Sequence, residues 1–247
     1  MSIASLKTPL GVLRVLIVLA IFVSTAVLII MINQGTPNWN LLATSAMIVI
    51  LAFVNFMDNR ATEKWSRFGL LMFIAMLICF VGDLLMASVF HITPDPLING
   101  VLMFALGHVV YLLALKDRSP LLLRSESPRL IMRNVIIWIV SIVIVVVLFV
   151  LTLYNPAEMV ISMGLFGYGI LLTTVLAFSL SKWFDRYPKL FVICLFIGFL
   201  LFFISDYIIG YRTLTDPTFL SGTEAVGVTY ICGQLLIHIS SLFGSEA

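Results

Sequence analysis

Residues 190–211, LFVICLFIGFLLFFISDYIIGY, form an apolar run in which Asp206 is the one charged residue. A second run, FGLLMFIAMLICFVGDLLMASVF over residues 68–90, carries Asp83 in a matching frame. Each run exceeds the roughly 20 residues that a helix needs to cross a bilayer. A carboxylate inside a span costs about 2.5–3.5 kcal/mol to insert, so an intramembrane aspartate is a functional-site candidate by default.

The composition of the whole chain is that of a membrane protein. Apolar residues make up 62% of it and charged residues 11%, whereas a soluble domain is about half apolar and about one quarter charged. The charges gather in short clusters between long apolar runs. We therefore predict an all-α, polytopic membrane protein with eight transmembrane helices. The predicted spans are residues 11–32, 38–57, 68–90, 97–115, 134–154, 157–180, 190–211 and 219–243.

The basic residues predict the orientation of the chain. Thirteen of the 14 Lys and Arg residues lie near the start of the first span or in the links after the second, fourth and sixth spans, and only Arg212 lies on the other side. The positive-inside rule then places both termini and these links in the cytoplasm, at the plasma membrane if the source is prokaryotic. The net charge of +2 thus reflects topology, and no nucleic-acid partner is expected.

The two halves of the chain have the pattern of repeats. Asp83 and Asp206 are 123 residues apart, and the pairs Gly107-His108 and Gly233-Gln234 are 126 apart. We predict a single membrane domain over residues 1–247, with four-helix halves at 11–115 and 134–243 and a cytoplasmic linker at 116–133. An even number of spans per half implies parallel repeats, which place functional residues at the interface between the halves.

Polar residues on four of the spans predict a site in the outer half of the bilayer. Asp83 lies 16 residues beyond Arg67, and Asp206 lies 17 beyond Lys189, which is about 24–26 Å along a helix. Residues three or four apart share a helix face, so the polar positions of the fourth and eighth spans form stripes. His238 continues the second stripe, and we expect no partner for it. The predicted pocket is lined by Asp83, His108, Tyr111, Asp206, Tyr230 and Gln234.

Four short blocks carry a family resemblance. They read FVGDLLM at 80–86, GHVVY at 107–111, FISD at 203–206 and YICGQLLI at 230–237. In order and spacing they resemble the YhhN-like lysoplasmalogenase family of eight-span membrane proteins, and the match covers most of residues 68–243. The chain departs from the family pattern at 37–40, PNWN, where many members carry Lys-Pro, and at Gln234, where some carry histidine.

The resemblance implies an activity and a catalytic pair. The activity is hydrolysis of the vinyl ether bond of lysoplasmalogens to a fatty aldehyde and a glycerophospho-base, so the partners are a lysophospholipid, water and membrane lipids. Asp83 and Asp206 would be the catalytic residues. Two close carboxyl groups can share one proton and act as acid and base without a metal, and no cofactor is expected.

The chemistry of the residues agrees with this activity. Protonation of the β-carbon of a vinyl ether gives an oxocarbenium ion, which water then captures. Asp83 is assigned as proton donor and Asp206 as stabiliser and water base, although the sequence is equally compatible with the reverse order. We expect His108 and Tyr111 to hold the carboxyl pair or the leaving glycerol oxygen. Tyr230 and Gln234 are expected to position water.

Two other functions fit the same aspartates. A proton-coupled transporter or channel is the alternative, since parallel repeats around buried carboxylates also occur in carriers. It predicts charged residues on both sides of the site, yet the inner stretches 68–81 and 190–204 contain none. A lipid-binding scaffold would use the aspartates only to join helices, and asparagine would replace them without loss of function.

The three cysteines lie in apolar runs with neither disulfide nor metal spacing.

Overall fold

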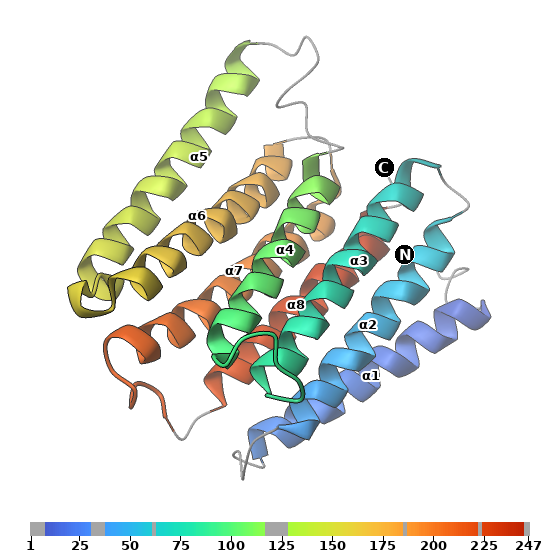
Figure 1. Cartoon of the computed structure of the whole chain (residues 1–247). Helices are drawn as coiled ribbons and strands as arrows, with labels where there is room; N and C mark the ends of the chain where they lie inside the picture. The colour runs from blue at the N-terminus through green and yellow to red at the C-terminus, as the bar shows by residue number, and fades with distance from the viewer. Residues whose placement is uncertain are drawn as a thin grey trace.

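The computed structural model describes residues 8–30, 38–60, 63–116, 128–184, 187–221 and 224–244. Within these ranges no strand occurs, and eight helices are long and apolar enough to cross a membrane (Figure 1). This confirms the predicted all-α, eight-span architecture. The helices are α1 (Pro9–Ile30), α2 (Trp39–Asn59), α3 (Glu63–Met86), α4 (Pro96–Lys116), α5 (Pro128–Leu148), α6 (Met159–Ser181), α7 (Lys189–Leu214) and α8 (Ala225–Gly244).

Three short elements adjoin α5 and α6. The π-helix η2 (Phe149–Leu153) continues α5, and the 3₁₀ turns η3 (Pro156–Glu158) and η4 (Lys182–Phe184) flank α6. The fifth helix begins at Pro128, six residues before the predicted span, so the predicted linker at 116–133 is partly helical. Residues 117–127 of that linker lie outside the described part of the chain.

The bundle has a central group of helices and two peripheral ones. The most extensive pairs are α3 with α4 and α7 with α8, while α6 bridges α4 and α7, and α2 bridges α3 and α8. The helices α1 and α5 lie at opposite edges of the bundle, packed mainly on α2 and α6 (Figure 1). The start of α1 and the end of α8 lie at the same end of the bundle. The interior of the bundle is therefore formed by α2, α3, α4, α6, α7 and α8.

Glycines allow the closest helix pairs to approach. A Cβ atom on Gly233 of α8 would lie 2.8 Å from the carbonyl oxygen of Gly198 on α7. A Cβ on Gly107 of α4 would lie 3.2 Å from the carbonyl oxygen of Ala75 on α3. Ala75 and Gly198 are themselves 123 residues apart. The same backbone approach therefore occurs at matching positions of the two halves, which supports the predicted repeat.

Polar contacts at two places hold the peripheral helix α1 on α2. Arg14 is buried and pairs with Asp58 at 2.7 Å, between Nη2 and Oδ2. Nearer the other end of α1, the Ser24 hydroxyl donates to Asn40 Oδ1 at 2.9 Å. The Asp58 side chain is 39% exposed, so the ion pair is buried only on its Arg14 side.

The last span is shorter than predicted, since α8 begins at Ala225 and not at residue 219. Residues 215–221 instead form turns. Asp216 Oδ1 accepts from the backbone N–H of Thr218 at 2.9 Å, and Arg212 donates to the carbonyl oxygens of Phe219 and Leu220 at 2.7 and 2.6 Å. These local hydrogen bonds satisfy backbone groups without a helix, which is the usual effect of aspartate near proline in a turn.

Candidate functional site

Asp83 and Asp206 border one cavity of about 200 Å³ near the C-terminal ends of α3 and α7. We call it the site cavity. Both aspartates, predicted to meet at the interface between the halves, thus lie on one cavity. Apart from the two carboxyl groups, its polar side chains are those of Asn38, Ser205 and Tyr230, and the rest of its lining is apolar. The apolar part consists of Leu41, Met86, Ala87, Phe104, Ile209, Val226 and Gly227.

Asp83 is held by two hydroxyl donors from other helices. Its carboxyl Oδ2 accepts a short hydrogen bond from Ser45 on α2 and one of 2.8 Å from Tyr230 on α8. The side chain is buried, with 5% of the residue exposed. A buried carboxyl group needs such partners, because an unsatisfied one would carry its full desolvation cost. Asp83 therefore connects three helices at one atom.

Asp206 has one hydroxyl donor and more open surroundings. Tyr168 of α6 donates a short hydrogen bond to its Oδ2. The residue is partly exposed, and besides the site cavity it borders two further cavities. The preceding residue, Ser205, donates to the carbonyl oxygen of Val226 at 3.1 Å and so ties α7 to α8 beside the site.

The surroundings of the two aspartates match at one position and differ at another. Ser45 and Tyr168 each precede their aspartate by 38 residues, on α2 and α6 respectively. The residue 126 positions before Tyr230 is Phe104, which borders Asp206 in one of the smaller cavities and has no hydroxyl. Asp83 thus has two hydroxyl donors where Asp206 has one.

The sequence prediction missed Ser45 and Tyr168. Each is a polar residue in an apolar run, and such residues are common contacts between membrane helices. The signal that could have found them is their separation of 123 residues, the same as that of the two aspartates.

The other predicted residues lie deeper in the bundle. Among the predicted residues, Tyr230 lines the site cavity with the aspartates, but His108, Tyr111 and Gln234 do not. The prediction of one pocket lined by all six was wrong for these three. Each step of three or four residues moves a side chain about 4.5–6 Å along the helix axis, so a stripe on one face leads away from the cavity.

These deeper residues form a buried polar cluster. The Tyr111 hydroxyl donates to Gln234 Oε1 at 2.9 Å and lies 3.0 Å from His238 Nε2. That hydroxyl has a single proton, so the tautomer of His238 decides whether its Nε2 donates to the hydroxyl or accepts from it. His108 Nδ1 bonds to the carbonyl oxygen of Phe104 at 2.8 Å. The expectation that His238 has no partner was therefore wrong.

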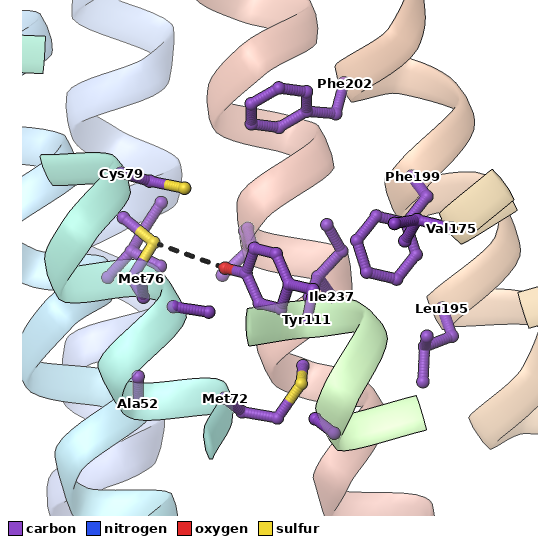
Figure 2. Close-up of a cluster of buried hydrophobic side chains, with 14 of the residues drawn as sticks. Ala52, Met72, Met76, Cys79, Tyr111, Val175, Leu195, Phe199, Phe202 and Ile237 are labelled. Carbon is purple, nitrogen blue, oxygen red and sulfur yellow. Dashed lines mark hydrogen bonds between the residues drawn. The ribbon is translucent and has the colours of Figure 1, made fainter. Parts of the chain in front are cut away.

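Tyr111, at the centre of this cluster, is surrounded mainly by apolar side chains. Figure 2 shows the side chain between Met76 and Cys79 on one side and Phe199 on the other. The ring of Tyr111 meets that of Phe199 edge-on, with centroids 5.4 Å apart, and its hydroxyl reaches the sulfur of Met76 at 3.9 Å. The residue is fully buried. It joins α4 to α3, α7 and α8.

Replacing Tyr111 with phenylalanine is expected to reduce stability. The change leaves Gln234 and His238 buried without their shared partner, which costs about 1–3 kcal/mol. Unfolding of the purified protein in a mild detergent measures this loss. The matched control is Tyr154→Phe, because Tyr154 is 49% exposed. Unchanged stability of Tyr111→Phe would show that this hydroxyl does not contribute to the fold.

Among the described residues, no group of three or more His, Cys, Asp or Glu residues could hold a metal ion.

Comparison with known proteins assigns the chain to a family. Neither the curated proteins nor the solved structures contain a match to the chain. The family model described as the YhhN family matches residues 39–241, a range that runs from the start of α2 into the last turn of α8. The chain, a multi-pass protein by its eight apolar helices, belongs to the YhhN family.

Proposed function

We propose that this protein hydrolyses the vinyl ether bond of lysoplasmalogen-type lysophospholipids, giving a fatty aldehyde and a glycerophospho-base. The observation that carries the proposal is the placement of Asp83 and Asp206 on one cavity within the membrane-spanning bundle. Two carboxyl groups that share a water-poor space can divide the tasks of acid and base between them. Membership of the YhhN family supports the same reaction class.

The hydrogen bonds favour Asp206 as the acid and Asp83 as the ionised partner. Asp83 accepts from Ser45 and Tyr230, and hydroxyl donors stabilise a carboxylate in its charged form. Asp206 accepts from Tyr168 alone, which leaves its second oxygen free to carry a proton toward a substrate. This reverses the assignment first made from the sequence, where the order of the two was open.

The proposed reaction begins with a proton transfer to carbon and ends with the return of a proton to the same aspartate. Asp206 transfers its proton to the β-carbon of the vinyl ether, and the adjacent carbon becomes part of an oxocarbenium ion. The Asp83 carboxylate stabilises that cation and accepts a proton as water adds to it. The resulting hemiacetal breaks into the aldehyde and the free glycerol hydroxyl. A proton then returns from Asp83 to Asp206 across the site cavity, so one water molecule is consumed in each turnover.

The shape of the site suits a single-chain lipid. The site cavity lies near the C-terminal ends of α3 and α7, and its lining is mainly apolar. Asn38, at the N-terminal end of α2, supplies a polar group at the same end of the bundle. In the predicted orientation this end is external. A lysophospholipid can therefore keep its headgroup at the membrane surface while its ether bond reaches the aspartates.

Loss of the Tyr168 hydroxyl is expected to slow the reaction. Asp206 becomes charged as it gives up its proton, and a hydrogen bond to a charged group contributes about 1.5–3 kcal/mol, so Tyr168→Phe should lower kcat by roughly 10–100-fold. Aldehyde release by the purified variant measures this effect. Tyr154→Phe, at an exposed position away from both aspartates, is the control and should match the wild type. Equal rates for both variants would remove Tyr168 from the mechanism.

The proposed activity is tested by incubating the purified protein with a lysoplasmalogen and measuring aldehyde. A lysophospholipid with a saturated alkyl ether is the control substrate, because it has no double bond to protonate. The proposal predicts aldehyde from the first lipid and no product from the second. Absence of turnover with every vinyl ether lipid would contradict it.

A proton-coupled carrier is the second candidate, and one observation favours it. The cluster of Tyr111, Gln234 and His238 extends from the region of the aspartates toward the other end of the bundle, where Asn55 donates to the carbonyl oxygen of His238 at 2.9 Å. A carrier needs polar groups on both sides of its site. Reconstituted vesicles with an imposed proton gradient separate the two functions, since only a carrier would collapse the gradient in the presence of its solute.

A further inference from the structure

Asp206 also borders a second cavity, lined by residues of η2, α5, α6 and α7. We call it the chain cavity. Its volume is about 40 Å³, compared with the roughly 10–15 Å³ that a single water needs on this measure. Polar groups on it come from Tyr168, Asp206 and Tyr207, and the remaining walls are apolar side chains such as Leu148, Leu165 and Phe203. A water-filled space would have polar groups on more of its walls.

Two glycines keep the walls of the chain cavity apart. A Cβ on Gly169 of α6 would lie 3.7 Å from Val145 Cγ2 on α5. A Cβ on Gly210 of α7 would lie 3.6 Å from Leu165 Cδ1 and 3.8 Å from Leu153 Cδ2. These are ordinary contact distances, so side chains could fit at both positions but would take up the space.

The same positions in the first half of the chain carry larger residues. Ala46 and Ala87 stand 123 residues before Gly169 and Gly210. The glycines thus leave room between α5, α6 and α7, beside Asp206. Glycine in a helix interior lowers helix stability by about 1 kcal/mol relative to alanine. A binding cavity at this position would explain why glycine is present despite this loss.

The outer wall of the chain cavity faces the membrane. Among the long helices α5 packs mainly on α6, and many of its side chains are exposed. Leu151 in the π-helix is 75% exposed, and Val150 is 60% exposed. π-helical turns occur frequently at functional sites. A ligand that enters from this side, between α5 and α7, comes from the hydrocarbon of the bilayer.

We propose that the chain cavity binds the hydrocarbon chain of the lipid whose ether bond lies at Asp206, an inference that rests on the proposed function. In a vinyl ether lysolipid the reacting carbons are the first two of the chain, so they separate the polar headgroup from the tail. Asp206 occupies the corresponding place in the protein, because it borders both the site cavity and the chain cavity. The headgroup and glycerol then lie in the site cavity. The first methylene groups of the tail lie between α5, α6 and α7.

The test uses a saturated alkyl-ether lysophospholipid with a photoreactive diazirine a few carbons along its chain. This probe is not hydrolysed, so binding is measured independently of activity. The wild type should be labelled at residues of the chain cavity, such as Leu148 or Leu165, and excess unlabelled probe should remove the label. Labelling spread evenly over the outer surfaces of the helices, with no competition, would show contact with bulk lipid only and would overturn the inference.

Substitution of Gly210 provides the matched comparison. Gly210→Leu should fill the chain cavity and reduce specific labelling by about tenfold or more, because each displaced methylene lowers affinity by roughly fourfold. Gly164→Leu is the control, since no atom lies within 4 Å of a Cβ at Gly164. If Gly210→Leu fails to fold, Gly210→Ala should still favour short-chain over long-chain probes. Unchanged labelling of a folded Gly210 variant would overturn the inference.

The outcomes for the chain cavity and for the proposed function are separate. Specific labelling that is lost on filling the cavity, combined with no aldehyde from any vinyl ether lipid, would support the chain cavity and reject the hydrolase. Aldehyde release with specific labelling at other residues would support the hydrolase and reject this location for the chain.

Discussion

Replacing either Asp83 or Asp206 with asparagine is expected to abolish aldehyde release, with a fall in kcat of about 10³-fold or more for each variant. Asparagine keeps the size of the side chain, but its amide can neither donate a proton to the vinyl ether nor accept one from water. Both carboxyl groups border the site cavity, so each loss removes one half of the acid–base pair. The rate is measured with the purified proteins at matched folded concentration.

The matched control for these variants is Asp95→Asn. Asp95 accepts from the backbone N–H of Leu97 at 2.8 Å at the start of α4, and an asparagine oxygen can accept the same bond. This variant should keep the wild-type rate. Full activity in both Asp83→Asn and Asp206→Asn would show that the aspartates only join helices. A protein that binds lipid as a scaffold would behave in that way.

The second large effect is expected at the contact between α7 and α8. Gly233→Ala places a Cβ 2.8 Å from the carbonyl oxygen of Gly198 and 3.0 Å from the backbone nitrogen of Phe202. Backbone atoms cannot turn aside as a flexible side chain can, so the helices must separate. Overpacking of this kind costs about 1–3 kcal/mol. Unfolding in detergent should show a clear loss of stability.

Activity should fall together with stability in Gly233→Ala. The hydrogen bond from Tyr230 of α8 to Asp83 and that from Ser205 of α7 to Val226 both depend on the position of α8. Gly164→Ala is the control, because a Cβ there meets no other atom within 4 Å. It should be at least as stable as the wild type, since alanine favours the helix. Equal stability of the two variants would contradict the close contact between α7 and α8.

The sequence was sufficient for the architecture and for the meeting of the aspartates. Eight long apolar runs determine eight helices, because the backbone in a bilayer must satisfy its own hydrogen bonds. The nearly equal separations of Asp83 and Asp206 from the charged starts of their spans, 16 and 17 residues, predicted a common depth. Both aspartates do lie on one cavity. These predictions rest on length and helical rise, which packing does not alter.

Which residues surround the aspartates could not be predicted from the sequence, because it depends on how the helices pack against one another. Tyr111 lies further along the bundle than the site, among Met76 and Phe199, and donates to Gln234 there. The donor Tyr168 lies on α6, a helix for which no site residue was predicted. Which helices surround the aspartates is a property of the whole bundle. A single span therefore indicates the depth of a residue but not its neighbours.

The predicted repeat explains one part of the site that single positions do not. Ser45 and Tyr168 occupy matching places, yet one is a small residue and the other a large aromatic one. Phe104 and Tyr230, 126 residues apart, also differ. Tyr230 donates its hydroxyl to Asp83, whereas Phe104, which borders a cavity with Asp206, has no hydroxyl to donate. The two aspartates thus have different surroundings. Such a difference allows one carboxyl to act as acid while the other remains ionised.

Direct proton transfer to carbon is the central claim, and deuterium incorporation tests it most directly. Hydrolysis of a lysoplasmalogen in heavy water, with the aldehyde reduced to the alcohol as it forms, preserves any label at the carbon next to the former carbonyl. Protonation by the aspartate pair predicts one deuterium at that carbon in every product molecule. An aldehyde formed without deuterium at that carbon would contradict the mechanism.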